Sequence, residues 1–206
     1  MDELPEFSRQ ALEVLREPLE DRKVTIARLG YSYEYPADCI FVAAMNPCRC
    51  GFYPDHTRCR CTLQDIRRYL EKISEPLLDR LDLCVETGMP EFHLYEGGVE
   101  TSEQIRERVE HTTAIQRQRY KKETFSYNSE LDSHTIRKYC PLGKSEQEYL
   151  ESFFEREDCS MRRLNRIIKV ARTIADMDGK EKIEETHITE AVRFRSISKK
   201  YWGVET

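Results

Sequence analysis

The chain has 206 residues, of which 39% are hydrophobic and 34% charged, and its formal net charge is −5. This charge excludes a strong general attraction to nucleic acid, although local basic clusters can still bind it. No apolar run approaches the roughly 18 residues of a membrane-spanning helix, so we expect no membrane partner. The first residues, MDELP, lack a secretory signal pattern. We therefore expect a cytoplasmic protein with reduced cysteines.

The first 38 residues carry the patterns of a helix and a β-hairpin. Ser8 can cap a helix that Pro18 should end or bend. Two short β runs follow, at 24–27 and 31–35, with a turn at Gly30 between them. Together they predict a hairpin whose second strand alternates tyrosines with polar residues.

Residues 39–45 form an apolar run that predicts a buried strand. The strand ends at Asn46-Pro47, because proline removes a backbone donor and blocks a further ladder. A polar residue at the carboxyl end of such a strand lies where α/β folds place their chemistry, so Asn46 is a candidate catalytic residue. Helix signals follow at Thr62 and Ser74, and residues 82–86 alternate like a second strand.

Two Cys-x-Cys pairs, eight residues apart, follow the first predicted strand: Cys48, Cys50, Cys59 and Cys61. Four thiolates in a tight loop suit a tetrahedral Zn²⁺ ion. The site would be structural, because four protein ligands leave no open position for water. Arg49, Arg58 and Arg60 flank the cysteines and would offset their charge. His56 could replace one sulfur, and reduced cysteines without a metal are the alternative.

Beyond residue 100 the pattern becomes helical. A long, mostly charged helix is predicted from Thr101 to Lys122, with a thin apolar stripe. Further helices are predicted at 132–140, 144–156, 160–177 and 186–197. The helix at 160–177 has the widest apolar face, and Gly179 is its expected end. The composition thus changes near residue 100 from α/β to all-α.

Four pieces of the sequence together resemble magnesium-chelatase-like AAA+ ATPases of the ComM competence-protein type. They keep the family's order and spacing, and the resemblance covers nearly the whole chain. The pieces are DELPEF (2–7), VAAMNPC (42–48), SEPLLDR (74–80) and RTIAD (172–176). Each piece is weak by itself, and the specificity comes from the set.

The resemblance implies roles for several polar residues. Asp2 and Glu3 are similar to the end of a Walker B strand, where the Asp holds Mg²⁺ and the Glu positions the attacking water. Asn46 is similar to the sensor on the adjacent strand, which orients that water. Arg80 is similar to an arginine finger that reaches the ATP of a neighbouring subunit, an interaction worth about 10³–10⁵ in rate in related nucleotide hydrolases.

The resemblance also makes Arg162, at the start of the helix at 160–177, the second sensor that contacts the nucleotide. Arg163 and Arg166 are alternates for this role. The hairpin around Tyr31–Tyr35 takes the position that this clade uses to line a central pore. Its tyrosines could stack on single-stranded DNA or could be ordinary strand residues.

Each assignment has a plainer alternative in the residues themselves. Asp2-Glu3 can be an acidic N-terminus, and Asn46 a turn residue. Arg80 can form a surface ion pair with Asp79, which contributes little stability. The arginines of the helix at 160–177 can form its solvated side.

The chain departs from the family in one respect, because it contains no GxxxxGK(S/T) motif. That loop supplies the backbone amides that cradle the phosphates. We expect this chain to be the C-terminal part of such an ATPase, from Walker B onward, and to be inactive alone. In this fold the P-loop strand lies between the strands predicted at 39–45 and 82–86. Without it we expect an incompletely paired sheet and modest stability.

The sequence and the resemblance together predict an α/β fold. Residues 1–90 form a partial AAA+ nucleotide-binding core with the hairpin and a four-cysteine insertion. Residues 91–123 form a connecting loop and the long charged helix. Residues 124–206 form an all-α helical lid domain.

The first functional hypothesis is a part of a ring-forming, ATP-driven motor that acts on DNA. Its partners would be ATP, further copies in a homo-oligomeric ring, and DNA, with Mg²⁺ at the nucleotide and structural Zn²⁺ on the cysteines. DNA as the cargo follows from the resemblance alone. The second hypothesis is a non-catalytic, zinc-binding interaction module with the same fold. A third, metal insertion into a porphyrin, finds no porphyrin site in these residues.

Overall fold

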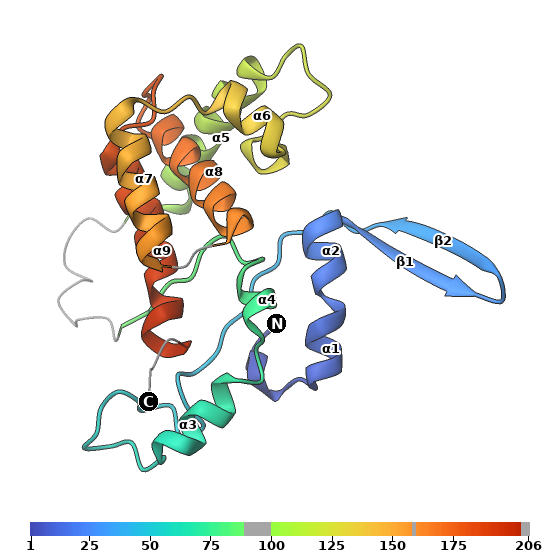
Figure 1. Ribbon diagram of the computed structural model, residues 1–206, viewed down its shortest axis with the longest axis vertical. Helices are drawn as coiled ribbons and strands as arrows, with labels where there is room; N and C mark the ends of the chain where they lie inside the picture. The colour runs from blue at the N-terminus through green and yellow to red at the C-terminus, as the bar shows by residue number, and fades with distance from the viewer. Residues whose placement is uncertain (89–99, 158–159, 203–206) are drawn as a thin grey trace. The chain divides into compact units, whose positions relative to one another are not determined.

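The computed structural model describes residues 1–88, 100–157 and 160–202 (Figure 1). These residues divide into two compact units. The first comprises Met1–Leu81 and the described residues from Ser198 onward, and the second comprises Asp82–Ile197. Within the described residues, no helix combines the length and the apolar character that crossing a membrane requires.

The first unit begins with short helices. Its elements are η1 (Leu4–Glu6), α1 (Arg9–Val14), α2 (Arg16–Asp21), β1 (Lys23–Arg28), β2 (Tyr31–Pro36), α3 (Leu63–Leu70) and α4 (Glu75–Leu78). Ser8 caps α1 as predicted, since its hydroxyl accepts from the amide of Ala11 at 3.2 Å. The predicted helix is interrupted at Leu15, between α1 and α2, rather than at Pro18. Pro18 lies in the first turn of α2, where a missing amide costs no intrahelical bond.

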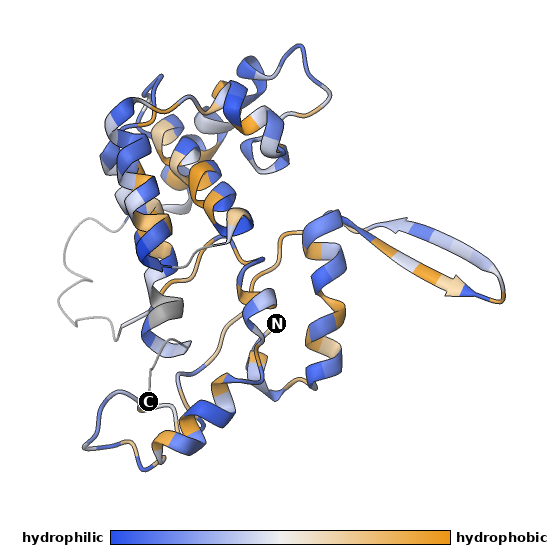
Figure 2. Ribbon diagram, in the orientation of Figure 1, coloured by the Kyte–Doolittle hydropathy of each residue, from blue (hydrophilic) through white to orange (hydrophobic). Residues whose placement is uncertain are grey.

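The predicted hairpin is confirmed. Strands β1 and β2 pair antiparallel, with Ile26 opposite Tyr33 and Arg28 opposite Tyr31. Leu29 and Gly30 form the two-residue turn, both with positive φ, which matches the twist of a two-residue hairpin. Figure 2 shows hydrophobic residues along β1. Because side chains alternate between the faces of a strand, one face carries three tyrosines and their partners Val24, Ile26 and Arg28.

The prediction of two further strands is wrong, since neither 39–45 nor 82–86 forms a strand. Phe41 and Ala43 pack against the core of the first unit. Ile40 and Val42, which alternate with these residues along the chain, are 94% and 71% exposed. A strand exists only where a neighbour completes its ladder, and within the described residues 42–44 bond only to Met1–Leu4. The expectation of an incompletely paired sheet stays a prediction, because no sheet forms at 39–45 or 82–86.

The core of the first unit consists of two adjoining clusters. The first contains Leu4, Leu12, Ile73, Leu77 and Leu78, and the second contains Cys48, Ile66, Tyr69 and Leu70. Met45 and Trp202 pack against both clusters. Trp202 is the chain's single tryptophan, and its indole N–H donates to the carbonyl oxygen of Leu70 at 3.0 Å. The end of the last helix is thereby fixed to α3.

The second unit is helical, as predicted. Its elements are α5 (Ser102–Arg119), η3 (Asn128–Glu130), α6 (Ser133–Tyr139), α7 (Lys144–Glu157), α8 (Met161–Met177) and α9 (Glu185–Trp202), whose last residues belong to the first unit. Its core includes Ile167, Ala171 and Ala175 from the apolar face of α8. Gly179 ends α8 with a φ of 66°, and the amide of Lys180 donates to the carbonyl oxygen of Ala175 at 2.8 Å.

A buried ionic cluster connects α5, η3 and α8. Arg172 and Asp176 are each only 1% exposed, although both are charged. Asp176 accepts from Arg172 and Arg119, and the Asn128 amide donates to it at 2.9 Å. Arg172 also donates to the carbonyl oxygen of Lys180 at 2.6 Å. The family-like piece RTIAD therefore has a structural role, which sequence reasoning missed.

Candidate metal centre and nucleotide-site residues

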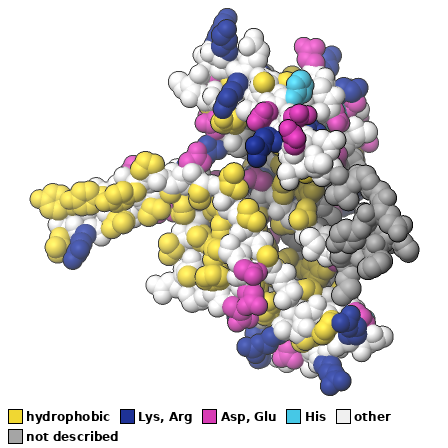
Figure 3. All heavy atoms as spheres, turned by 180° about the vertical axis from the view of Figure 1, so that it is seen from behind, with side chains coloured by type: hydrophobic (Ala, Val, Ile, Leu, Met, Phe, Trp, Pro, Cys, Tyr) yellow, Lys and Arg dark blue, Asp and Glu magenta, His cyan; other side chains and the backbone are white. Residues whose placement is uncertain are grey.

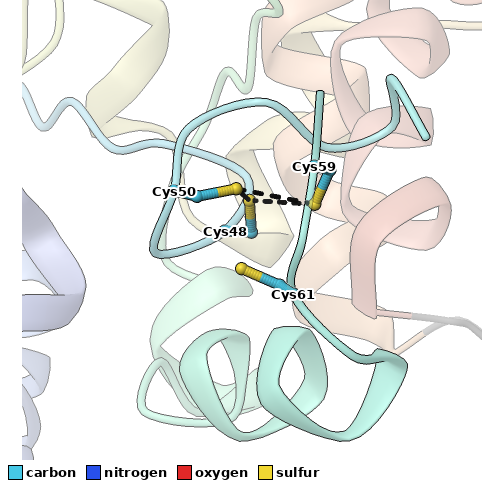
Figure 4. A group of neighbouring side chains, drawn as sticks. All are labelled: Cys48, Cys50, Cys59 and Cys61. Carbon is cyan, nitrogen blue, oxygen red and sulfur yellow. Dashed lines mark hydrogen bonds between the residues drawn. The ribbon is translucent and has the colours of Figure 1, made fainter. Parts of the chain in front are cut away.

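The four cysteine sulfurs lie together in one loop (Figure 4). Cys48 Sγ is 3.4 Å from Cys50 Sγ and 3.8 Å from Cys59 Sγ, and Cys50 Sγ is 3.6 Å from Cys59 Sγ. All four ligand atoms, including that of Cys61, lie within 4.8 Å of one another. Sulfurs placed tetrahedrally at Zn–S distances of about 2.3 Å would be about 3.8 Å apart. The donor set and its spacing therefore fit zinc.

The loop is closed by its own hydrogen bonds. Gly51, with a φ of 82°, donates its amide to the carbonyl oxygen of Cys48 at 3.0 Å. The Asp55 carbonyl accepts from the amide of Cys59 at 2.8 Å, which brings the second cysteine pair back to the first. The Asp55 carboxylate accepts from Thr57, which fixes the turn. His56 lies outside the group of cysteine ligand atoms.

The cysteine loop is anchored on α3. Cys48 is fully buried against Ile66, Tyr69 and Leu70. Thr62 caps α3 in a capping box with Asp65, as the sequence predicted for its start. The backbone amide of Phe52 lowers the pKa of the Cys50 thiol to about 6, which favours the thiolate that a metal requires. Against backbone hydrogen bonds that lower it, burial and the neighbouring sulfurs raise the pKa of the Cys59 thiol to about 12, and they also raise that of the Cys61 thiol. The site thus combines a fixed scaffold with one thiol, that of Cys50, whose pKa favours the metal-binding form.

The segments that carry Asp2, Glu3 and Asn46 lie side by side. The Met1 carbonyl oxygen accepts from the amide of Ala44 at 2.9 Å, and the Leu4 amide donates to the Ala44 carbonyl oxygen at 3.1 Å. The Met1 amino group donates to the carbonyl oxygen of Val42 at 2.6 Å. These bonds have the pattern of parallel pairing, in which both segments end at the same edge. Asp2-Glu3 therefore lies beside the segment that leads to Asn46.

Asp2, Glu3 and Asn46 lie at the surface. Glu3 has a positive φ of 49° at the start of η1, and its amide donates to the Asp2 carboxylate at 2.9 Å. Asp2, Glu3 and Asn46 are all exposed. The Asn46 side chain lies next to Gly51, where an added Cβ would be 3.8 Å from the Asn46 Cγ. The predicted sensor thus adjoins the cysteine loop directly.

Arg80 lies against α2. Its side chain is 9% exposed, and its Nε is 3.5 Å from the carboxylate of Glu20. Its Nε–H donates to the carbonyl oxygen of Arg16 at 3.0 Å, and a terminal N–H donates to that of Pro76 at 2.6 Å. A hollow of about 730 Å³, lined by residues of α1, α2 and β1, reaches Arg80. Sequence reasoning had no signal for the contact with Arg16, because that residue is 64 positions away in the chain.

Arg162 is exposed in the first turn of α8. Ser160 caps this helix by accepting from the amide of Arg163 at 3.2 Å. Arg166, the other alternate for the second sensor, donates to the Asp82 carboxylate at 2.5 Å. Of these three arginines, Arg162 is the most exposed to solvent, while the other two are partly buried.

Comparison with known proteins identifies the family. The sequence model of magnesium chelatase, subunit ChlI, matches residues 1–95, and that of the ChlI C-terminal region matches residues 99–195. Competence protein ComM of Haemophilus influenzae is 40% identical over 200 residues, which are 96% of this chain and 38% of that protein. The uncharacterized protein YifB of Escherichia coli is 38% identical over 202 residues, which are 97% and 39% of the two chains. The uncharacterized protein Rv2897c of Mycobacterium tuberculosis is 33% identical over 201 residues, 95% of this chain and 39% of that protein.

The matches define a magnesium-chelatase-like protein, and the chain belongs to that family, whose domains imply an AAA+-like fold. Its relatives include ComM and YifB proteins. The chain spans 38–39% of the length of these relatives. The resemblance stated from the four sequence pieces is therefore confirmed.

Proposed function

We propose that this chain supplies water-aligning and charge-neutralising residues to a ring-forming ATPase that acts on DNA. One observation carries the proposal. The main chain of Met1–Leu4 pairs with that of Val42–Ala44, so the segment that contains Asp2-Glu3 lies beside the segment that leads to Asn46. Folds of this class place their chemistry at such an edge.

Within the proposed site, Asp2 would hold Mg²⁺ and the Glu3 carboxylate would orient the attacking water. The ion, when bound with ATP, neutralises charge on the phosphates. The Asn46 amide would hold the same water by hydrogen bonds without adding negative charge. All three residues are exposed, so a nucleotide held by a P-loop elsewhere could reach them.

Arg80 and Arg162 would neutralise negative charge on the phosphates of the bound nucleotide. A guanidinium suits this task, because its planar donors match the oxygens of a transferring phosphoryl group. Arg162 is exposed in the first turn of α8. Arg80 would first have to leave the carbonyl oxygens of Arg16 and Pro76.

The hairpin supports DNA as the cargo. Tyr31, Tyr33 and Tyr35 are all exposed, and the rings of Tyr31 and Tyr33 stack with their centroids 6.5 Å apart. Figure 3 shows hydrophobic side chains over the hairpin. Exposed rings spaced along a strand offer stacking platforms for the bases of single-stranded DNA. Zinc on the four cysteines would hold the loop beside Asn46 and would take no part in turnover.

The test joins this chain to the P-loop-bearing part of a family member and measures ATP binding and turnover. Glu3→Gln and Asn46→Ala should lower turnover by about 10²-fold or more and leave ATP affinity unchanged, as expected for groups that act on the water. Glu6→Gln, which alters another exposed carboxylate of the same short helix, is the matched control. Full turnover by Glu3→Gln would overturn the assignment.

A second candidate function is a non-catalytic, zinc-binding interaction module. The burial of the Arg80 side chain against α2 favours it, because an arginine finger must reach a neighbouring subunit. In that case the joined protein would bind zinc and show no turnover above that of Glu3→Gln. Turnover that depends on Arg80 would exclude this second function.

A further inference from the structure

Five arginines lie on the cysteine loop and the helix that follows it. They are Arg49, Arg58, Arg60, Arg67 and Arg68, called here the arginine surface. All five are exposed, and within the part of the chain that the structure describes none of them forms an ion pair with a carboxylate. The chain as a whole has a net charge of −5. The concentration of these arginines over 20 residues is therefore a local feature of this loop.

The loop and helix parts of the arginine surface adjoin each other. Hydrogen bonds from Thr62 lower the pKa of Asp65, and the charges of Arg68 and Arg49 lower it further. Arg49 comes from the loop and Arg68 from α3, so both lie near the same carboxylate. That carboxylate is already engaged by the Thr62 hydroxyl at 2.6 Å. Figure 3 shows Lys and Arg side chains, with Asp and Glu side chains between them, at the lower end of the view, where Figure 1 places α3 and the cysteine loop.

An aromatic ring lies within the same loop. The Arg58 guanidinium carbon lies 4.0 Å from the centroid of the Phe52 ring. Phe52 is 40% exposed, although it is a large apolar residue on a loop. A ring flanked by a guanidinium offers a flat platform for a nucleic-acid base, since both stack on π systems.

The charge balance favours an anionic partner. A Zn²⁺ ion on four thiolates would leave a formal charge of about −2. Asp55 and Asp65 lie among the arginines and keep their negative charge, because hydrogen bonds from Thr57 and Thr62 lower the pKa of each carboxyl. The five arginines exceed the combined charge of the metal centre and these two carboxylates by about +1. A loop that needed only to offset its metal centre would need fewer exposed arginines.

We propose that the arginine surface binds the phosphates of a single-stranded nucleic acid and that Phe52 stacks on one of its bases. Arginines provide the phosphate contacts, and the ring accounts for the preference for unpaired bases. This contact is separate from the hairpin and needs neither ATP nor a ring. It goes beyond the proposed function, because it would exist in a protein without turnover.

The test measures the affinity of the zinc-loaded chain for a labelled dT20 oligonucleotide by anisotropy, between about 50 and 200 mM salt. Arg49→Ala with Arg68→Ala should weaken binding and reduce the salt slope by about 1.4, because each lost contact to a single strand contributes about 0.7. Phe52→Ala should weaken binding by about 5- to 150-fold and leave the slope unchanged. A labelled U20 should bind through the same residues.

The matched control is Arg106→Ala with Arg137→Ala, which removes the same charge from exposed positions of α5 and α6. This control should bind dT20 like the unaltered chain. Thermal unfolding and zinc content of each variant establish that it is folded. Equal losses in the control and in Arg49→Ala/Arg68→Ala would overturn the proposal. The proposal would also be overturned if only the Tyr31→Ala/Tyr33→Ala variant lost dT20 binding. It would likewise be overturned if polyglutamate bound the chain as well as dT20 does.

Discussion

Arg80 donates its Nε–H to the main-chain carbonyl oxygen of Arg16 at 3.0 Å, and this bond holds the side chain against α2. A residue proposed to reach across a subunit boundary is therefore bound within its own chain. Glu20 lies 3.5 Å from the same Nε. The contact defines a resting position that the side chain must leave before it can meet a nucleotide.

The first prediction concerns this residue. In the protein joined to a P-loop segment, Arg80→Ala should lower ATP turnover by about 10³–10⁵-fold while ATP binding persists. Arg80→Lys should not restore turnover, since a lysine lacks the planar donor fork. Steady-state turnover and nucleotide titration measure both quantities. Normal turnover in Arg80→Ala would remove the arginine-finger role.

The second prediction concerns the cysteines. Elemental analysis should find about one zinc per chain, because four thiolates form one tetrahedral site. Cys48→Ser with Cys59→Ser should lose the metal. Cys39→Ser, which alters an exposed cysteine outside the cluster, should keep it. Metal retained by the double variant would show that these sulfurs are not its ligands.

The third prediction concerns the buried ionic cluster. Asp176→Ala should lower the free energy of unfolding by about 3–5 kcal/mol, because Arg172 would remain charged without its partner in a buried site. Chemical denaturation measures this change. Glu110→Ala, at an exposed position of α5, should change stability by less than about 0.5 kcal/mol. Similar losses in both variants would contradict the assigned role of Asp176.

The fourth prediction concerns the uncovered side of residues 39–45. Ile40 and Val42 are exposed apolar residues, and within the described residues the backbone of 42–44 bonds on one side only, to Met1–Leu4, which favours self-association. Ile40→Lys with Val42→Lys should reduce association in sedimentation experiments and leave the unfolding midpoint nearly unchanged. Phe41→Lys should instead destabilise the first unit, because Phe41 packs on its core. Association of the Ile40→Lys/Val42→Lys variant equal to or greater than that of the unaltered chain would contradict the role of these two side chains in self-association.

Local features were predictable from the sequence. The hairpin, the caps at Ser8 and Thr62 and the cysteine cluster all depend on residues close in the chain. The Gly179 helix end was predictable for the same reason. Each of these features is decided by turn and capping chemistry within a few residues.

Features that depend on distant partners were not predictable. Residues 39–45 have the composition of a strand, but a strand requires a neighbour, and the residues alone do not reveal whether one is present. Arg119 pairs with Asp176 across 57 residues, and no local pattern joins them. One signal was available, because Arg172 and Asp176 are charged residues four apart on the apolar face of α8. The roles of Asp2, Glu3, Asn46, Arg80 and Arg162, and the domain boundaries at residues 90 and 123, stay predictions.

Trp202 gives the cysteine loop an optical reporter of its own. Its indole is bonded to α3, and Cys48 is buried against the same helix. No other tryptophan contributes to the emission of this chain. A change in the wavelength of indole emission on adding or removing zinc would therefore report directly on the packing of the loop, without a label.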